Sequence, residues 1–105
     1  MLLRNALIIL CSLSTATAKV SFNNDIRPLL SNTCLRCHGP DENERKANRR
    51  LDTLDGATAD LDGTRAVVAG NIDASELIYR ITTDDPDELM PPPKAGKRFT
   101  AAQIA

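Results

Sequence analysis

The sequence predicts one small all-α domain, and three observations support that prediction. The chain has 105 residues, which is enough for a single domain and no more. Residues 22–33 and 74–82 each space their apolar side chains as one face of a helix does. Only 3% of the residues are aromatic, and Trp is absent. This shortage of large side chains favours a bound cofactor that completes the core.

Residues 1–18 have the pattern of a secretory signal peptide. Arg4 supplies the positive charge, residues 6–13 are apolar, and the Ala-Thr-Ala sequence at 16–18 suits cleavage. The apolar run is too short to span a bilayer, although a retained anchor or a buried N-terminal helix is the alternative. We therefore expect an exported protein, periplasmic or at the cell surface, whose mature domain is 19–105 and lacks an integral membrane span.

The first predicted helix covers residues 22–33, and its last turn leads into a cysteine motif. Asn23 or Asn24 is the expected N-cap, because both residue types accept hydrogen bonds from free backbone amides. Its apolar face consists of Phe22, Ile26, Leu29 and Leu30. One further turn along this face reaches Cys34.

The middle of the chain, residues 39–72, is predicted to be mostly irregular. Gly39-Pro40 ends the helical pattern, and Asp55-Gly56 and Asp62-Gly63 are turn signals. A second helix is then predicted over residues 74–82, with Asp73 and Glu76 in the positions of a capping box.

An acidic, proline-rich loop follows, and it cannot be helical from Met90 onward because each proline fixes φ and removes a donor. The final residues, Thr100 to Gln103, form a second capping-box pattern. A helix that starts there and stops at Ala105 gains too little to offset its nucleation. We therefore expect a truncated C-terminal helix and a longer natural protein of which this domain is the N-terminal part.

Charge is nearly balanced, with 13 basic and 14 acidic residues. This balance gives no electrostatic footprint for nucleic acid, so no nucleic-acid partner is expected. The acidic residues 84–88 lack the spacing of a calcium loop and are interpreted as a solvated rim. A basic stretch is also expected to be exposed; it comprises Arg45, Lys46, Arg49 and Arg50.

The most informative motif is C-x-x-C-H, formed by Cys34, Cys37 and His38. This spacing is the attachment signature of c-type haem. Two thiols can add to the two vinyl groups of the haem, and the adjacent imidazole can ligate the iron. The second imidazole nitrogen then needs an orienting acceptor, which the sequence does not identify. A thiol–disulfide oxidoreductase that uses the same cysteine pair is the alternative, although it usually requires a βαβ context.

Met90 is the candidate sixth ligand of the iron. It is the only methionine in residues 19–105, and three prolines follow it. His/Met ligation is the arrangement that raises the reduction potential of cytochromes c. A core-filling role for Met90 is the alternative. If Met90 does not bind, the sixth position is open, as in a haem-based sensor.

Several segments resemble those of the planctomycete-type cytochrome c domain. The resemblance covers about residues 20–105 and implies a class I-like fold around one covalent haem, with Cys34, Cys37, His38 and Met90 as its site residues. Similar proteins often have Gly-Leu at positions 48–49, where this chain has Asn-Arg. The motifs that carry the resemblance are Asp25-Ile26-Arg27-Pro28, Cys34-Leu35-Arg36-Cys37-His38, Arg50-Leu51-Asp52-Thr53 and Met90-Pro91-Pro92-Pro93.

Together these patterns predict an electron-transfer domain rather than an enzyme. No catalytic acid, base or nucleophile is expected. The cofactor is expected to be a single haem c, and the partner a redox protein or a fused downstream domain. In class I-like folds the last helix covers the first one, so its truncation would leave the apolar face of Phe22, Ile26 and Leu30 without its partner.

Overall fold

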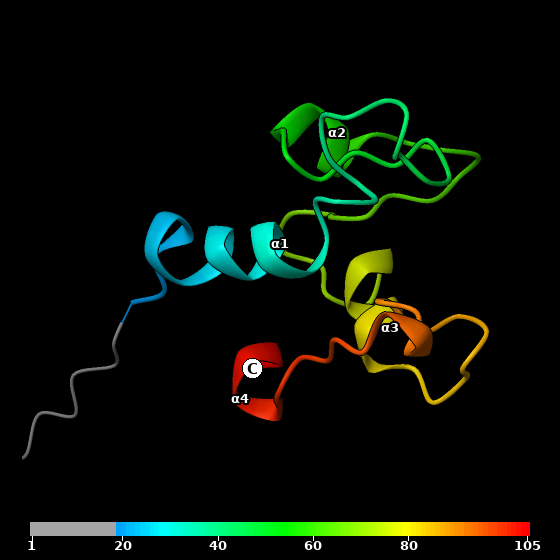
Figure 1. The fold of residues 1–105 in the computed structure, drawn as a ribbon. Coiled ribbons are helices and arrows are strands. Elements are labelled where there is room, and N and C mark those ends of the chain that lie inside the picture. Colours follow the sequence, from blue (N-terminus) through cyan, green and yellow to red (C-terminus); the bar gives the residue numbers. More distant parts are fainter. Residues whose placement is uncertain (1–18) are drawn as a thin grey trace, which may run out of the picture.

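The computed structural model describes residues 19–105, so the predicted signal peptide lies outside the described residues. Regular structure in this range is helical, and the only strand-like pairing within it is an isolated bridge between Leu61 and Thr64. The all-α prediction is therefore confirmed for this part of the chain. The elements are η1 (Phe22–Ile26), α1 (Arg27–Thr33), α2 (Leu54–Thr58), α3 (Glu76–Thr82), η2 (Pro93–Ala95) and α4 (Ala101–Ile104) (Figure 1).

The first predicted helix is present, as a π-helical turn, η1, that continues into α1. Its cap differs from the prediction. The hydroxyl of Ser21, rather than Asn23 or Asn24, accepts a hydrogen bond, from the Asn24 amide at 3.3 Å. Asp25 completes the cap by accepting the Ser21 amide at 2.8 Å. Both asparagines lie within the first turn, where their own amides need acceptors.

Helix α3 begins at Glu76, two residues later than predicted, and the capping box at Asp73 is wrong. The preceding loop replaces that cap, because the amides of Glu76 and Leu77 donate to the carbonyls of Arg65 and Ala66 at 2.9 and 3.0 Å. The Glu76 carboxylate is then free to bind Arg80 one turn later, at 2.8 Å.

Residues 39–72 are mostly irregular, as predicted, but Leu54–Thr58 forms the short helix α2 where a turn was expected. The Thr53 side chain caps it by accepting the Gly56 amide at 3.0 Å. The turn at Asp62-Gly63 is confirmed, since both residues have positive φ, +55° and +86°. The Met90 loop is non-helical through Pro92, but Pro93–Ala95 then forms one 3-10 turn, contrary to the prediction.

At the C-terminal end, Lys97 is hydrogen-bonded to α1, and α4 begins with its own cap. The Lys97 ammonium donates to the carbonyl of Asn32 in α1 at 2.6 Å. The predicted capping box at the start of α4 is confirmed, because Thr100 and Gln103 each accept the other's backbone amide, at 3.2 and 2.9 Å.

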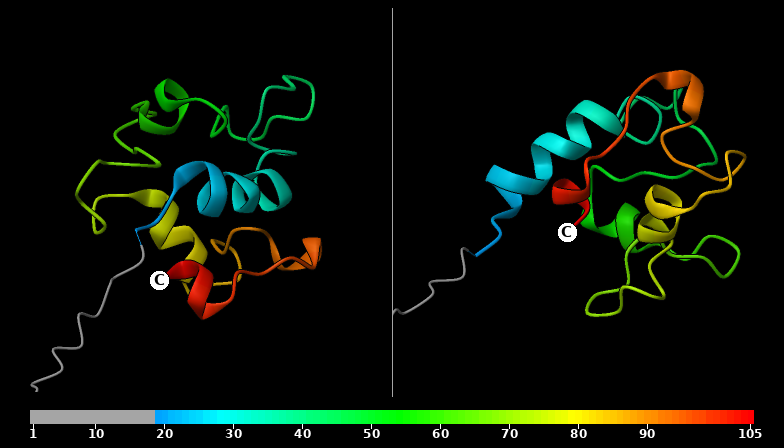
Figure 2. Two further views of the ribbon diagram at one scale, coloured as in Figure 1. Left: turned by 90° about the vertical axis from the view of Figure 1, so that its left-hand side faces the viewer. Right: turned by 90° about the horizontal axis from the view of Figure 1, so that it is seen from below.

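The core of the described residues is small. Long loops join the helices, which do not stack into a bundle (Figure 2). Among residues 19–105, four are buried, namely Gly39, Leu51, Ala66 and Ser75. Phe22 on η1 remains 56% exposed. None of the described helices has both the length and the apolar character needed to cross a bilayer. Some of the half-buried apolar side chains, among them Leu61, Leu77 and Ile81, line a cavity, which is the candidate functional site.

Candidate haem site

One cavity of about 770 Å³ is lined by Cys34, Cys37, His38 and Met90 together. The volume lies in the range of roughly 300–1,000 Å³ that is typical of small-molecule and cofactor sites. The structure therefore brings all four predicted site residues to one space, although Met90 is far from the others in sequence.

The end of helix α1 delivers the cysteine motif to this cavity. Cys34 follows the last helical residue, and its amide still donates to the Leu30 carbonyl at 2.8 Å. The chain then winds on, with the amides of Cys37 and His38 donating to the Cys34 carbonyl at 3.3 and 2.9 Å. This continuous winding turns both thiols and the imidazole toward the same side.

Gly39, directly after His38, allows the chain to pass close to this turn. A Cβ atom at Gly39 would lie 2.1 Å from the carbonyl oxygen of Leu35, which is far inside contact distance. The residue is also buried. Any side chain here would displace the backbone of the cysteine motif.

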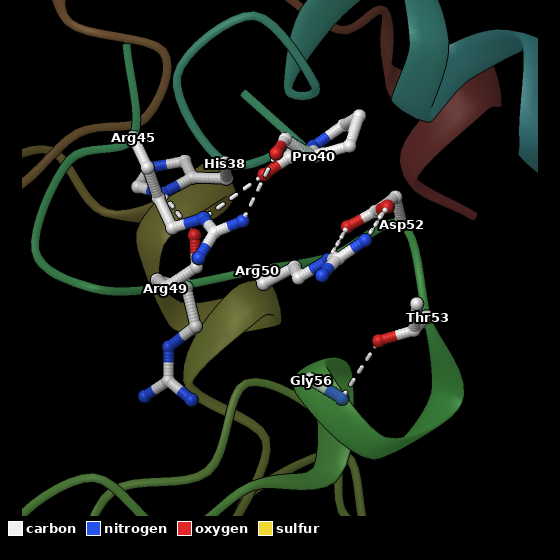
Figure 3. A network of polar contacts seen from close by, with 9 residues as sticks. His38, Pro40, Arg45, Arg49, Arg50, Asp52, Thr53 and Gly56 are labelled. Carbon is white, nitrogen blue, oxygen red and sulfur yellow. Dashed lines mark hydrogen bonds and ion pairs between the residues drawn. The ribbon is translucent and has the colours of Figure 1, made fainter. Parts of the chain in front are cut away.

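A returning segment, residues 45–51, fixes the motif by backbone hydrogen bonds. The amides of Lys46 and Leu51 donate to the carbonyls of Cys37 and His38, both at 2.7 Å. The Arg45 guanidinium also donates to the carbonyls of Gly39 and Pro40, at 3.0 and 3.3 Å (Figure 3). The carbonyl groups of residues 37–40, which lie beyond the end of α1, are thus satisfied.

The missing acceptor for the second nitrogen of His38 is the carbonyl of Arg49, 3.2 Å from Nδ1 (Figure 3). With Nδ1 donating to this oxygen, Nε2 keeps the lone pair that a metal ligand needs. No sequence signal could have identified this partner, because every residue has a carbonyl and only the path of the chain selects one.

The predicted exposure of the basic stretch is wrong for its three arginines, which are half-buried. The Arg49 guanidinium donates to the carbonyls of Ala59 and Thr64, both at 3.0 Å. Arg50 pairs with Asp52 through two bonds of 2.7 and 2.9 Å and holds the pKa of that carboxyl below its usual range. Arginine carries five donors, so it can satisfy loop carbonyls that have no helix or sheet partner. Lys46 is exposed, as predicted.

Helix α3 holds the backbone of Met90, which lines the cavity from a segment far from His38 in sequence. The Met90 amide donates to the Arg80 carbonyl at 2.8 Å. The Arg80 guanidinium donates to the carbonyl of Glu88 at 3.4 Å. The hydroxyl of Tyr79 donates to the Glu88 carboxylate, and this bond raises the pKa of the phenol.

The composition of the cavity wall suits a large, mainly apolar group with two thiol-reactive positions and a metal. The wall holds one imidazole and one thioether that can ligate a metal, and the two thiols of Cys34 and Cys37. Burial raises the pKa of the Cys34 thiol, which keeps it protonated. The apolar part of the wall comprises Ala47, Leu51, Leu61, Ala66, Leu77, Ile81, Pro91, Pro92 and Ala95.

Comparison with known proteins gives one match. The sequence model of a family described as planctomycete cytochrome C matches residues 34–94, more than half of the chain. No curated protein and no solved structure gives a significant match. The matched segment includes the cysteine motif, the returning segment, α3 and the Met90 loop. The chain therefore belongs to the planctomycete cytochrome c family.

Proposed function

We propose that this chain binds one haem c covalently through Cys34 and Cys37, ligates its iron with His38 and Met90, and transfers single electrons outside the cytoplasm. The observation that carries the proposal is the shared cavity, lined by both thiols, the imidazole and the thioether. The electron partner is a redox protein or a downstream domain of the same polypeptide.

Attachment requires both cysteines as thiols, and both are free in this structure. With haem bound, each S–H would add across one vinyl C=C bond: a C–S bond would form, the vinyl π bond would be lost, and the hydrogen would pass to the other vinyl carbon. Such an addition balances without an oxidant or a reductant. A disulfide between the cysteines would have to be reduced before this step.

In electron transfer the residues of this chain act by holding a fixed environment. The bound haem supplies an iron that changes between ferric and ferrous by one electron. His38, oriented through Nδ1 by the Arg49 carbonyl, keeps Nε2 in one direction. The Met90 loop is held to α3 by its backbone. A ligand set that is the same in both oxidation states keeps the reorganisation energy of electron transfer small.

Thiol–disulfide exchange is the less favourable reading of the same cysteines. A reactive thiol of that class has a lowered pKa, commonly from a helix N-terminus. Here Cys34 lies at the C-terminal end of α1, where the helix dipole disfavours a thiolate. Burial raises its pKa further. Both effects oppose nucleophilic attack by Cys34.

The test is retention of haem after acid–acetone extraction of protein matured with a cytochrome c assembly system. Wild type should keep its colour, and the double variant Cys34→Ala/Cys37→Ala should lose it completely. Met90→Ala is the matched control, because it removes a proposed iron ligand and leaves both attachment points. Haem that extracts freely from wild type would disprove the covalent attachment.

A further inference from the structure

We propose that Arg49 is a positioning residue that couples the imidazole of His38 to the loop of residues 59–64 on the cavity wall. The inference rests on the proposed haem function and adds a residue that the motif does not contain. One residue makes both connections. Its carbonyl faces Nδ1 of His38, and its guanidinium holds the loop.

The contacts of the Arg49 side chain are long-range and directed at backbone oxygens. Two different guanidinium nitrogens donate to Ala59 and Thr64, each at 3.0 Å. Thr64 also pairs with Leu61 across the turn, at 2.9 and 3.1 Å, so the guanidinium holds both ends of a closed loop. Leu61 and Thr64 line the cavity beside His38. The loop therefore cannot move from the wall without pulling on Arg49.

The backbone of Arg49 is held less firmly than its neighbours. The amides of Lys46 and Leu51, on either side, make 2.7 Å bonds to the cysteine motif. Between them, Ala47 and Asn48 both have φ of +52°, a region that non-glycine residues rarely adopt. The bond from His38 to the Arg49 carbonyl is the longer one, at 3.2 Å. The Arg49 amide donates to the Lys46 carbonyl at 3.0 Å within the same short segment, so the guanidinium is the anchor that ties Arg49 to a distant part of the chain and on which the length of this bond depends.

The hydrogen bond between His38 and the Arg49 carbonyl should affect the reduction potential. When the N–H at the second ring nitrogen of a ligating histidine donates to a carbonyl, the basicity of the nitrogen that binds the metal increases. A more basic imidazole favours the ferric state, which has the higher charge. Releasing Arg49 from the loop should lengthen this bond, reduce that basicity and raise the reduction potential.

The experiment compares haem-loaded wild type with Arg49→Leu, Arg49→Lys and Arg65→Leu. Leucine removes every donor, and lysine cannot hold two separated carbonyls with a planar fork. Arg65 is the matched control, because it also donates to a backbone carbonyl, that of Thr58 at the end of α2 at 2.9 Å, but is exposed and outside the cavity. The readouts are the reduction potential, the NMR signal of the His38 ring N–H, and amide exchange in segments 46–52 and 59–65.

Arg49→Leu should raise the potential, speed exchange of the ring N–H, and increase amide exchange in both segments at once. Arg49→Lys should give a smaller shift in the same direction. Arg65→Leu should leave the potential and segment 46–52 unchanged. Coupling is excluded if the potential and the ring signal of both Arg49 variants match those of wild type, or if Arg65→Leu moves them equally.

The two hypotheses fail in different ways. If wild type carries no covalent haem, the proposed function is wrong, and amide exchange in the haem-free chain still decides the coupling: Arg49→Leu must loosen segments 46–52 and 59–65 together. If Arg49→Leu does not load haem, the reduction potential of Arg49→Lys and the same amide-exchange measurement decide whether the coupling exists. Loosening of 59–65 alone would overturn the inference.

Discussion

Two segments that line the cavity are built differently. The His38 wall, residues 34–52, is fixed by backbone bonds of 2.7 Å from Lys46 and Leu51 and by Arg45 on the carbonyls of Gly39 and Pro40. In the Met90 wall, residues 76–92, one backbone bond joins the Met90 loop to α3, from the Met90 amide to the Arg80 carbonyl at 2.8 Å. The other ties between that loop and α3 are made by side chains, from Arg80 to the Glu88 carbonyl at 3.4 Å and from the Tyr79 hydroxyl to the Glu88 carboxylate.

This difference in hydrogen bonding indicates that the His38 wall is the part of the site that is fixed before a cofactor binds. Segments with few buried contacts and few hydrogen bonds open at low free energy. The His38 wall contains the buried Gly39 and Leu51, whereas every residue of the Met90 wall is at most half-buried. We expect changes in the His38 wall to affect folding and haem attachment, and changes in the Met90 wall to affect the spectrum and the potential.

The largest expected effect comes from Gly39→Ala, which breaks the His38 wall. The new Cβ would overlap the Leu35 carbonyl, so the cysteine turn must shift, at a cost of about 3 kcal/mol or more. Urea unfolding and the yield of covalent haem measure this. Gly63→Ala is the control: nothing lies within 4 Å, and only its positive φ of +86° is penalised, by about 1–2 kcal/mol. Equal stability of Gly39→Ala and wild type would contradict the proposed close packing.

Met90→Ala tests the Met90 wall. If Met90 ligates the iron, the weak near-infrared band of the ferric protein should disappear, the reduction potential should fall, and carbon monoxide or cyanide should bind. The free energy of unfolding should fall by about 1–2 kcal/mol, less than for a fully buried methionine. Leu89→Ala is the control, because Leu89 lines a smaller cavity of about 350 Å³ and not the large one. An unchanged spectrum would favour another ligand or the open sixth position of a sensor.

The smallest expected effect is the pH dependence of the Arg50–Asp52 pair at the edge of the His38 wall. The hydrogen bond from Arg50 lowers the folded-state pKa of Asp52, so the pair stabilises the fold above the unfolded pKa of about 3.9. That stabilisation is lost as the pH falls through the lower folded pKa. Asp52→Asn should therefore lower the melting temperature slightly at pH 7, and the difference from wild type should vanish in strong acid.

Asp87→Asn is a suitable control for that measurement. Asp87 is exposed and forms no ion pair with any of residues 19–105. Its melting temperature should follow that of wild type at every pH. A difference between Asp52→Asn and wild type that persists below pH 2 would show that the effect of Asp52 is not one of charge.

Sequence reasoning succeeded where the interacting groups are neighbours in the chain. The helix over residues 22–33 and the capping box of Thr100 and Gln103 depend on contacts three or four residues apart, and both are present. Where the predictions of helix caps were wrong, a different group had taken the place of the predicted hydrogen-bond partner. Ser21 replaced the asparagines as the cap, and carbonyls from residues 65–66 replaced Asp73 at the start of α3. A capping pattern gives the residues that are able to cap, but the approach of another segment decides which one does.

The sequence by itself determined the reactive groups: two thiols and an imidazole at fixed spacing, and one methionine before three prolines. These follow from covalent order and residue type. Only the tertiary structure decided that Met90 lines the same cavity as His38, that Arg49 supplies the acceptor for Nδ1, and that Arg45 and Arg49 of a charged stretch bind backbone carbonyls. The physical reason is that irregular loops leave backbone oxygens unpaired, and the donors that satisfy them come from whichever segment the folded path brings near.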